Sequence, residues 1–183
     1  MIIGLGNPGE RFENTRHNAG WIALDKLAGA NNWQLEKKFN SLIKKEAGFI
    51  YLKPNSYMNR SGEDAYQALK YYQLLSRQFG LFLKKEQDLK NVLAVIHDDL
   101  DLDLGNFKIS TNSRSGGNKG VQSIIKHLKT KNFCRLKLGI KNDLLRNTIP
   151  AEKFVLQKFN SEEMNILDAT IDKGLEALKK AYY

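Results

Sequence analysis

Short apolar runs alternate with amphipathic stretches along the chain, and this pattern predicts alternating strands and helices. The run at 92–96 is continuously apolar and rich in valine and isoleucine, which is typical of a central strand buried on both faces. Shorter runs predict strands at 1–5, 107–110 and 135–140, and a hairpin over 39–54. Apolar residues at helical spacing predict helices within 19–30, 61–75, 121–128 and 161–178.

The strand–helix alternation predicts an α/β fold, specifically a three-layer α/β/α sandwich around a twisted, mixed and mostly parallel sheet. Because no linker or internal repeat is visible, residues 1–183 are expected to form a single domain. Ser61 is expected to cap the second helix, with Asp64 three residues on. Residues 76–91 are ambiguous, and their apolar run 81–83 fits either an extension of that helix or a packed loop.

A glycine-rich loop follows the first predicted strand and formally matches the Gly-x-Gly-x-x-Gly dinucleotide pattern at Gly4, Gly6 and Gly9. That pattern binds a pyrophosphate only when a helix opens inside the glycine run. Here Pro8 lies inside the run, and roughly ten irregular residues separate it from the next helical periodicity. A nucleotide cofactor is therefore the weaker interpretation of this loop, and no cofactor is expected.

His17 ends the same loop, and Asp98 follows the predicted central strand. Two parallel strands end at the same edge of a sheet, so the two side chains are expected to meet there. A carboxylate on one imidazole nitrogen fixes the tautomer, and the other nitrogen can then take a proton from water. We therefore interpret His17 as a general base and Asp98 as its partner, against the simpler view of His17 as a surface or capping residue.

The acidic stretch 97–103 is a candidate metal site. A calcium loop does not fit, because counting from Asp99 places Leu104 where glycine is needed and Ser110 where glutamate is needed. Magnesium stays an open alternative without specific support, and our prediction is that no metal is bound. Asp101 and Asp103 are expected to lie in a solvated turn.

Two further stretches offer candidate ligand contacts. Asn55 and Asn59 flank Tyr57-Met58 and could line a cleft, or could simply form a turn. The loop 114–120 ends at a predicted helix N-terminus, where backbone N–H groups favour anions. Many basic residues lie near this loop in the sequence, and they form either a phosphate-binding face or simply a solvated lysine-rich surface. They are Lys108, Arg114, Lys119, Lys126, Lys129, Lys131, Arg135 and Lys137.

Charge and cysteine content narrow the function classes. Of 183 residues, 29 are Lys or Arg and 20 are acidic, for a net charge of +9, which favours a polyanionic partner such as nucleic acid. The one cysteine, Cys134, lies in an apolar run and is expected to be a small buried hydrophobe. No apolar run approaches the length of a membrane span, so we expect a cytoplasmic protein that does not contact membranes.

Four long motifs resemble the bacterial-type peptidyl-tRNA hydrolases in order and spacing: 4–9 (GLGNPG), 15–20 (TRHNAG), 57–62 (YMNRSG) and 97–101 (HDDLD). The stretches 116–117, 133–140 and 154–156 extend this resemblance over nearly the whole chain. It implies a monomer, with no obligate protein partner, that cleaves the ester between a peptide and the terminal ribose of tRNA. By motif position, the resemblance implies His17 and Asp98 as catalytic residues.

The resemblance also implies a set of residues that bind the substrate at the acceptor end of the tRNA. The set comprises Asn7, Phe12, Tyr57, Met58, Asn59, Lys108, Gly117, Asn118, Lys119, Arg135 and Lys137. Three departures affect it: Asn118-Lys119 replaces a usual His-Asn, Lys137 replaces an arginine, and Phe12 replaces a common tyrosine. Because of the altered loop at 118–119, a non-catalytic RNA-binding protein on the same fold is the alternative function.

Overall fold

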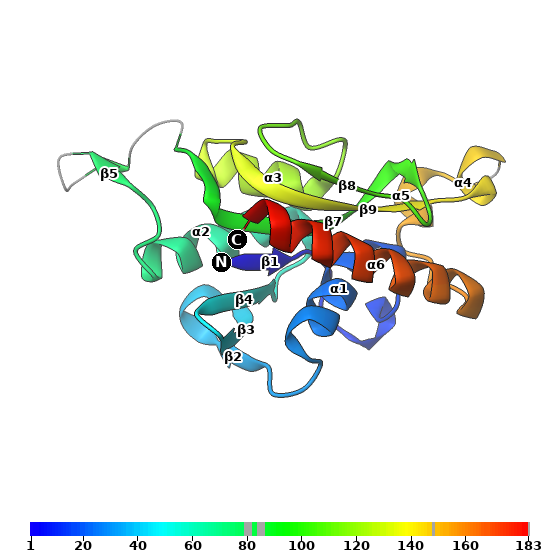
Figure 1. Cartoon of the computed structure of the whole chain (residues 1–183), viewed down its shortest axis with the longest axis horizontal. Helices are drawn as coiled ribbons and strands as arrows, with labels where there is room; N and C mark the ends of the chain where they lie inside the picture. The colour runs from blue at the N-terminus through cyan, green and yellow to red at the C-terminus, as the bar shows by residue number, and fades with distance from the viewer. Residues whose placement is uncertain (79–81, 84–86, 148, 183) are drawn as a thin grey trace.

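A seven-stranded sheet in the order β2-β3-β4-β1-β7-β9-β8 runs through the molecule (Figure 1). The structure, a computed structural model, describes residues 1–78, 82–83, 87–147 and 149–182. The four central strands β4, β1, β7 and β9 are parallel, whereas β2, β3 and β8 join the sheet through antiparallel pairings. The strands are β1 (Ile2–Gly4), β2 (Gln34–Glu36), β3 (Ser41–Glu46), β4 (Phe49–Pro54), β7 (Leu89–Asp103), β8 (Phe107–Ser110) and β9 (Phe133–Lys141).

Two pairs of helices cover the two faces of this sheet. The helices α1 (Ala19–Ala28) and α6 (Ser161–Tyr182) pack on one face, and α2 (Ser61–Tyr71) and α3 (Lys119–Leu128) pack on the other. Alternation along β1 sends Ile2 into the first core and Ile3 into the second. The predicted three-layer α/β/α sandwich is confirmed, with a mixed sheet. Cys134 is buried in the α1–α6 core as expected.

Short elements complete the fold. A separate two-stranded hairpin consists of β5 (Arg77–Gln78) and β6 (Phe82–Leu83). The remaining elements are η1 (Glu10–Phe12), η2 (Arg16–Asn18), η3 (Lys37–Phe39), η4 (Met58–Arg60), α4 (Asp143–Asn147) and α5 (Ala151–Phe154).

The strand order reverses at β1, which pairs with β4 on one side and β7 on the other. Open α/β sheets form a crevice at such a point, beyond the carboxyl ends of the strands. Gly20, in the first turn of α1, lies directly on this crevice, because a Cβ there would come within 2.3 Å of the Ile96 carbonyl oxygen. Only glycine permits this approach. The close packing fixes the loop before α1, with His17, at the crevice.

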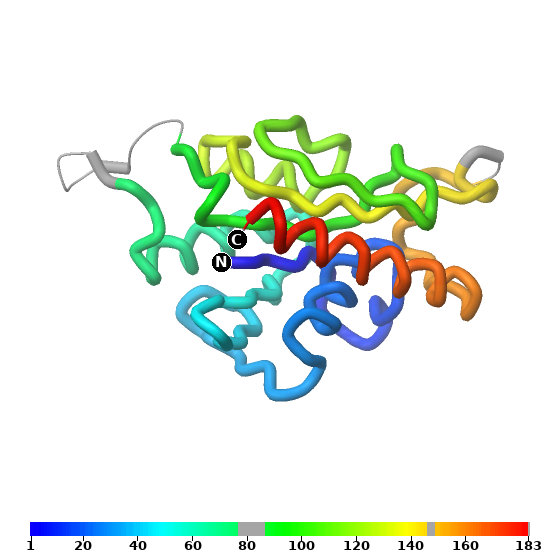
Figure 2. Tube along the Cα trace, in the orientation of Figure 1, coloured from blue at the N-terminus to red at the C-terminus, as the bar shows by residue number. Residues whose placement is uncertain are grey.

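Segments far apart in the chain also meet near this crevice. Figure 2 shows the loop before α1, in blue, beside the orange segment between α5 and α6. Main-chain hydrogen bonds join them, from Arg16 N to Gln157 O at 3.0 Å and from His17 N to Val155 O at 2.8 Å. Thr15 also forms a β-bridge with Lys158. Arg16 adds a buried ion pair with Glu163 of α6, at 2.8 Å. The loop and this segment therefore form one packed unit.

Two expectations for single elements are wrong. Ser61 is the first residue of α2 rather than its cap, and its buried hydroxyl has no partner in the described residues. Instead, Asp64 accepts hydrogen bonds from the backbone and hydroxyl of Ser56. The stretch 97–103 continues β7 rather than forming a turn, because it pairs with β9; Asp101 and Asp103 are exposed as expected, but on a strand.

Residues 82–83 belong to the β5–β6 hairpin rather than to an extended α2, which ends at Tyr71. Leu81, the other end of that run, lies outside the described residues.

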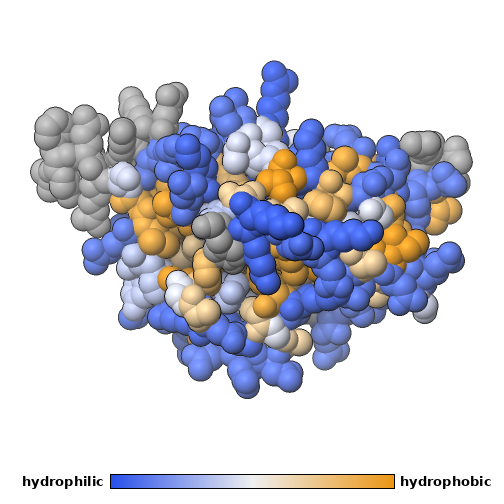
Figure 3. Space-filling model, in the orientation of Figure 1, coloured by the Kyte–Doolittle hydropathy of each residue, from blue (hydrophilic) through white to orange (hydrophobic). Residues whose placement is uncertain are grey.

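On the face shown in Figure 3, hydrophilic side chains cover most of the surface and hydrophobic ones appear in smaller patches. In the part of the chain that the structure describes, no helix is both long and apolar enough to cross a bilayer.

Candidate active site

A cleft of about 430 Å³ opens at the carboxyl edge of β1 and β7. His17, Asp98, Asn7 and the residues 57–59 contribute to its lining. The loop before α3 contributes Gly116, Gly117 and Asn118, and Lys119 is the first residue of α3. The opposite wall consists of Leu100, Ala151 and Glu152 of α5, and Val155 and Leu156 just after α5. Nine of the predicted site residues therefore meet at one cleft. Asn55, the other amide considered there, does not line it.

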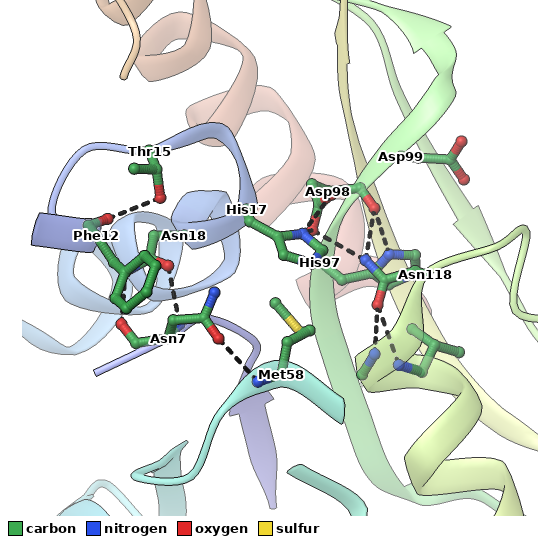
Figure 4. A network of polar contacts seen from close by, with 12 residues as sticks. Asn7, Phe12, Thr15, His17, Asn18, Met58, His97, Asp98, Asp99 and Asn118 are labelled. Carbon is green, nitrogen blue, oxygen red and sulfur yellow. Dashed lines mark hydrogen bonds and ion pairs between the residues drawn. The ribbon is translucent and has the colours of Figure 1, made fainter. Parts of the chain in front are cut away.

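His17 and Asp98 form a buried pair at the base of this cleft (Figure 4). His17 Nδ1 lies 2.9 Å from both carboxylate oxygens of Asp98. The side chain of His17 is 11 % exposed and that of Asp98 is 3 % exposed. With Nδ1 occupied by the carboxylate, Nε2 is the nitrogen left for a ligand in the cleft. The geometry can therefore hold one imidazole tautomer and direct a basic nitrogen at a bound molecule.

Four effects set the pKa of His17. Burial lowers it, but the charge of Asp98 and the hydrogen bond to Asp98 raise it by more, while the charge of Lys119 lowers it. The net result is a pKa above the ordinary value of 6.5. The imidazole is thus a stronger base than a free histidine, as proton transfer from water requires.

Asn118 joins Asp98 to the start of α3. Its Nδ2 donates to Asp98 Oδ1 at 2.9 Å and to the Asp98 carbonyl oxygen at 3.2 Å. Its Oδ1 accepts from the backbone N–H groups of Gly120 and Val121, which caps the helix. These contacts use the whole Asn118 amide, which both orients Asp98 and caps α3.

A second amide network holds Asn7 in place. The side chain of Asn18 exchanges two hydrogen bonds with the backbone of Asn7, at 2.8 and 3.0 Å. Asn7 Oδ1 accepts from Met58 N at 2.8 Å. This leaves the Asn7 Nδ2 donors for a bound molecule (Figure 4). Asn59, the next residue after Met58, is exposed and also lines the cleft.

Aromatic and charged side chains border the cleft. Tyr57 lines it and is 53 % exposed, whereas Phe12 packs edge-on against Tyr57 at a centroid distance of 6.1 Å without lining the cleft itself. Lys119 Nζ lies 2.9 Å from Glu152 Oε1, so an ion pair joins the first residue of α3 to α5.

The predicted phosphate-binding residues on β8 and β9 differ in exposure. Lys108 is exposed and lies opposite Lys137 across the two strands. Lys137 Nζ pairs with Asp99 at 2.9 Å and lies 4.0 Å from the position of a Cβ on Gly116, at the border of the cleft. Arg135 is fully buried, and its guanidinium donates to Ser113, Arg114 O and Lys131 O. Its assignment to substrate binding is therefore corrected: Arg135 holds the 113–114 loop from inside.

His97 precedes Asp98 and is buried as well. Its Nδ1 lies 2.7 Å from the Asp98 carbonyl oxygen and donates to it. Burial lowers the pKa of His97 to about 4, against the opposing charges of Asp98 and Asp99, so the ring is neutral near pH 7. Within the described residues, no three His, Cys, Asp or Glu side chains are grouped as metal ligands would be.

Sequence reasoning did not identify the opposite wall of the cleft or the role of Asn18. Glu152, Val155 and Leu156 carry no catalytic signature of their own, and only the stretch 154–156 was singled out, as part of the resemblance. Asn18 lay within a recognised motif, but its function depends on a fold of the loop that brings it against Asn7.

A buried histidine–aspartate pair beside amide donors, in the crevice of a three-layer α/β sandwich, is an arrangement typical of hydrolytic enzymes. The peptidyl-tRNA hydrolase family model matches residues 1–183. The chain belongs to the peptidyl-tRNA hydrolase family.

Individual relatives agree with this assignment. Peptidyl-tRNA hydrolase of Metamycoplasma arthritidis is 38 % identical over 100 % of this chain and 91 % of its own length. That of Aquifex aeolicus is 35 % identical, with 99 % and 88 % covered. A crystal structure of peptidyl-tRNA hydrolase from Acinetobacter baumannii superposes with a TM-score of 0.77 at 30 % identity, covering 99 % of this chain and 87 % of that one.

Proposed function

We propose that this protein hydrolyses the ester bond between a peptide, or an N-blocked amino acid, and the terminal ribose of tRNA. The single observation that carries the proposal is the His17–Asp98 pair at the base of a cleft that also contains the Asn7 amide. We further propose that the chain acts as a single domain and a monomer in the cytoplasm, where it would recycle peptidyl-tRNA.

In the proposed reaction, His17 is the general base. Asp98 accepts a hydrogen bond from Nδ1–H and stays ionised, and Nε2 removes a proton from a water molecule as the water oxygen attacks the ester carbonyl. The tetrahedral intermediate then expels the ribose oxygen, which takes the proton from Nε2 and leaves as a hydroxyl. The products are a free carboxylic acid and tRNA, and the histidine returns to its neutral form.

Amide donors are proposed to hold the ester in place. Asn7 Nδ2 and the side chain of Asn59 face the cleft, and donors of this kind stabilise negative charge on a carbonyl oxygen during attack. Lys119, Lys108 and Lys137 supply positive charge at or near the cleft for the phosphates of the acceptor end. The apolar wall with Leu100, Val155 and Leu156 suits the peptide side chains.

The direct test is release of an N-acetylated amino acid from its tRNA by the purified protein, with a chelator present. We expect turnover by the wild type and a loss of about 10²–10⁴-fold in His17→Ala, because a general base contributes on this order. Circular dichroism checks that the variant is folded. Near-normal turnover of His17→Ala contradicts the role of His17.

The same experiment distinguishes the alternative function. The residue that favours it is Lys119, whose charge stands at a position where the family usually has asparagine. A wild-type protein that binds tRNA but releases no amino acid would be a non-catalytic RNA-binding protein on this fold.

A further inference from the structure

The start of α3 and the start of α5 both border the cleft, and a side-chain contact joins them. Lys119 and Glu152 both line the cleft, and their charged atoms lie 2.9 Å apart. Their side chains are 59 % and 80 % exposed, so solvent reaches the pair freely. The contact therefore spans the cleft mouth instead of filling its interior.

We propose that Glu152 is a positioning residue that holds the Lys119 ammonium over the cleft mouth, beside His17 and in the path of an anionic group of the substrate. This inference rests on the proposed function. An ammonium has three donors, and Glu152 accepts from one of them, so two stay available for a phosphate or for the ester oxygen. Without Glu152, the flexible lysine side chain would extend into water.

The position of the Lys119 ammonium affects the pKa of His17. The charged groups that act on His17 are Asp98 from β7 and Lys119 from α3. Just after α5, the Val155 carbonyl accepts from the His17 backbone N–H, and Val155 lines the same cleft as His17. Arg16, the neighbour in sequence, is paired with Glu163 of α6. Glu152 therefore influences His17 through the placement of Lys119.

This role predicts how the pKa of His17 responds to substitution. Because the Lys119 charge lowers that pKa, Lys119→Met is expected to raise it. Glu152→Gln is expected to raise it as well, by a smaller amount, since the released lysine moves away. The double variant should match Lys119→Met, because Glu152 acts only through Lys119. NMR titration of the free protein measures this directly, since the chain has only three histidines.

Steady-state kinetics supply the second readout. Glu152→Gln should raise KM for N-acetyl-aminoacyl-tRNA severalfold with little change in kcat, and Glu152→Asp should restore part of the effect. The matched control is Glu176→Gln, which removes an exposed ion pair with Lys180 on α6, away from the cleft. It should change neither KM nor the His17 titration.

Two outcomes would overturn the inference while the proposed function stands. One is an active Glu152→Gln variant with the KM and His17 pKa of the wild type. The other is a lowered His17 pKa in Glu152→Gln, which would mean that Glu152 merely neutralises Lys119. An inactive wild type would instead contradict the proposed function, while the NMR titration would still decide whether Glu152 positions Lys119.

Discussion

At the scale of single residues, the basicity of His17 is set by a balance between burial and its neighbours. Asp98 outweighs burial and Lys119, so the pKa of His17 lies above 6.5 in the folded protein. His97, one residue from Asp98, shows the opposite outcome, because burial dominates there and its pKa falls to about 4. Two histidines at one edge of the sheet thus have pKa values shifted in opposite directions, and of these two only His17 lines the cleft.

This balance predicts the pH dependence of turnover. A base works only when neutral, so kcat/KM is expected to fall as the pH drops through the raised pKa of His17, with a midpoint above 6.5. Asp98→Asn removes the charge that raises this pKa, so the midpoint should move to lower pH while maximal turnover drops by about 10²-fold. Rates measured from pH 5 to 9 check both effects. A midpoint that stays unchanged in Asp98→Asn would contradict the pairing.

At the scale of elements, the start of α3 joins helix capping to the active site through Asn118. Serine caps helices about as well as asparagine but has no amide to reach Asp98, whereas alanine lacks both functions. Asn118→Ser should therefore retain about 1 kcal/mol more stability than Asn118→Ala in urea unfolding. Both variants should lose turnover, because Asp98 loses its donor. Full activity in Asn118→Ser would remove Asn118 from the positioning of Asp98.

The contact between the His17 loop and α6 gives a second prediction at this scale. Burial raises the pKa of Glu163, but Arg16, Asn160 and Asn142 lower it by more, so the net shift is downward. The Arg16–Glu163 pair therefore stabilises the fold fully at pH values above the usual Glu pKa of 4.5. This stabilisation is lost as the pH falls through the lowered pKa of Glu163.

Glu163→Gln leaves the Arg16 guanidinium buried without a counter-charge and should cost about 3–5 kcal/mol of unfolding free energy. Urea unfolding at pH 7 measures it, with the exposed neighbour Glu162→Gln as control. Equal stability of the two variants would contradict the importance of this buried pair.

The sequence predicted the elements with strong periodicity and the residues whose motifs are contiguous. The strand at 107–110 forms where it was predicted, and α6 buries Leu167, Ile171, Leu175 and Leu178 at the predicted helical spacing. The hydrophobic pattern could not show that 97–103 extends the strand. These residues are mostly polar, and they continue β7 because they pair with β9. The sequence likewise could not show that Arg135 is buried, because its guanidinium donates to the Ser113 and Arg114 carbonyls of a loop far away in the sequence.

At the scale of the whole molecule, the net charge of +9 comes from cations that differ in exposure and in pairing. Some cations are inside or paired, such as Arg135 and Lys137, while others such as Lys108 are exposed near the cleft side of the sheet. Only cations that meet phosphates release counterions on binding, so the total charge does not determine the salt dependence.

Lys108→Ala is therefore expected to weaken tRNA binding and to reduce the slope of log Kd against log salt by about 1. Lys173→Ala, an exposed lysine on α6, is the control and should leave the slope unchanged. Filter binding between 50 and 200 mM salt, roughly the range over which such slopes are resolved, measures it. Equal slopes for both variants would remove Lys108 from the RNA contact.

The link between the His17 loop and the segment 155–158 has one more consequence. Its hydrogen bonds run between main-chain atoms, from Arg16 and His17 to Gln157 and Val155. Side chains on this segment can therefore change without moving the base. Leu156, 47 % exposed and on the cleft wall, is the position with the most freedom. Evolution or a protein engineer can vary substrate preference there while the chemistry stays intact, so a saturation library at this position should yield many active clones with altered peptide preference.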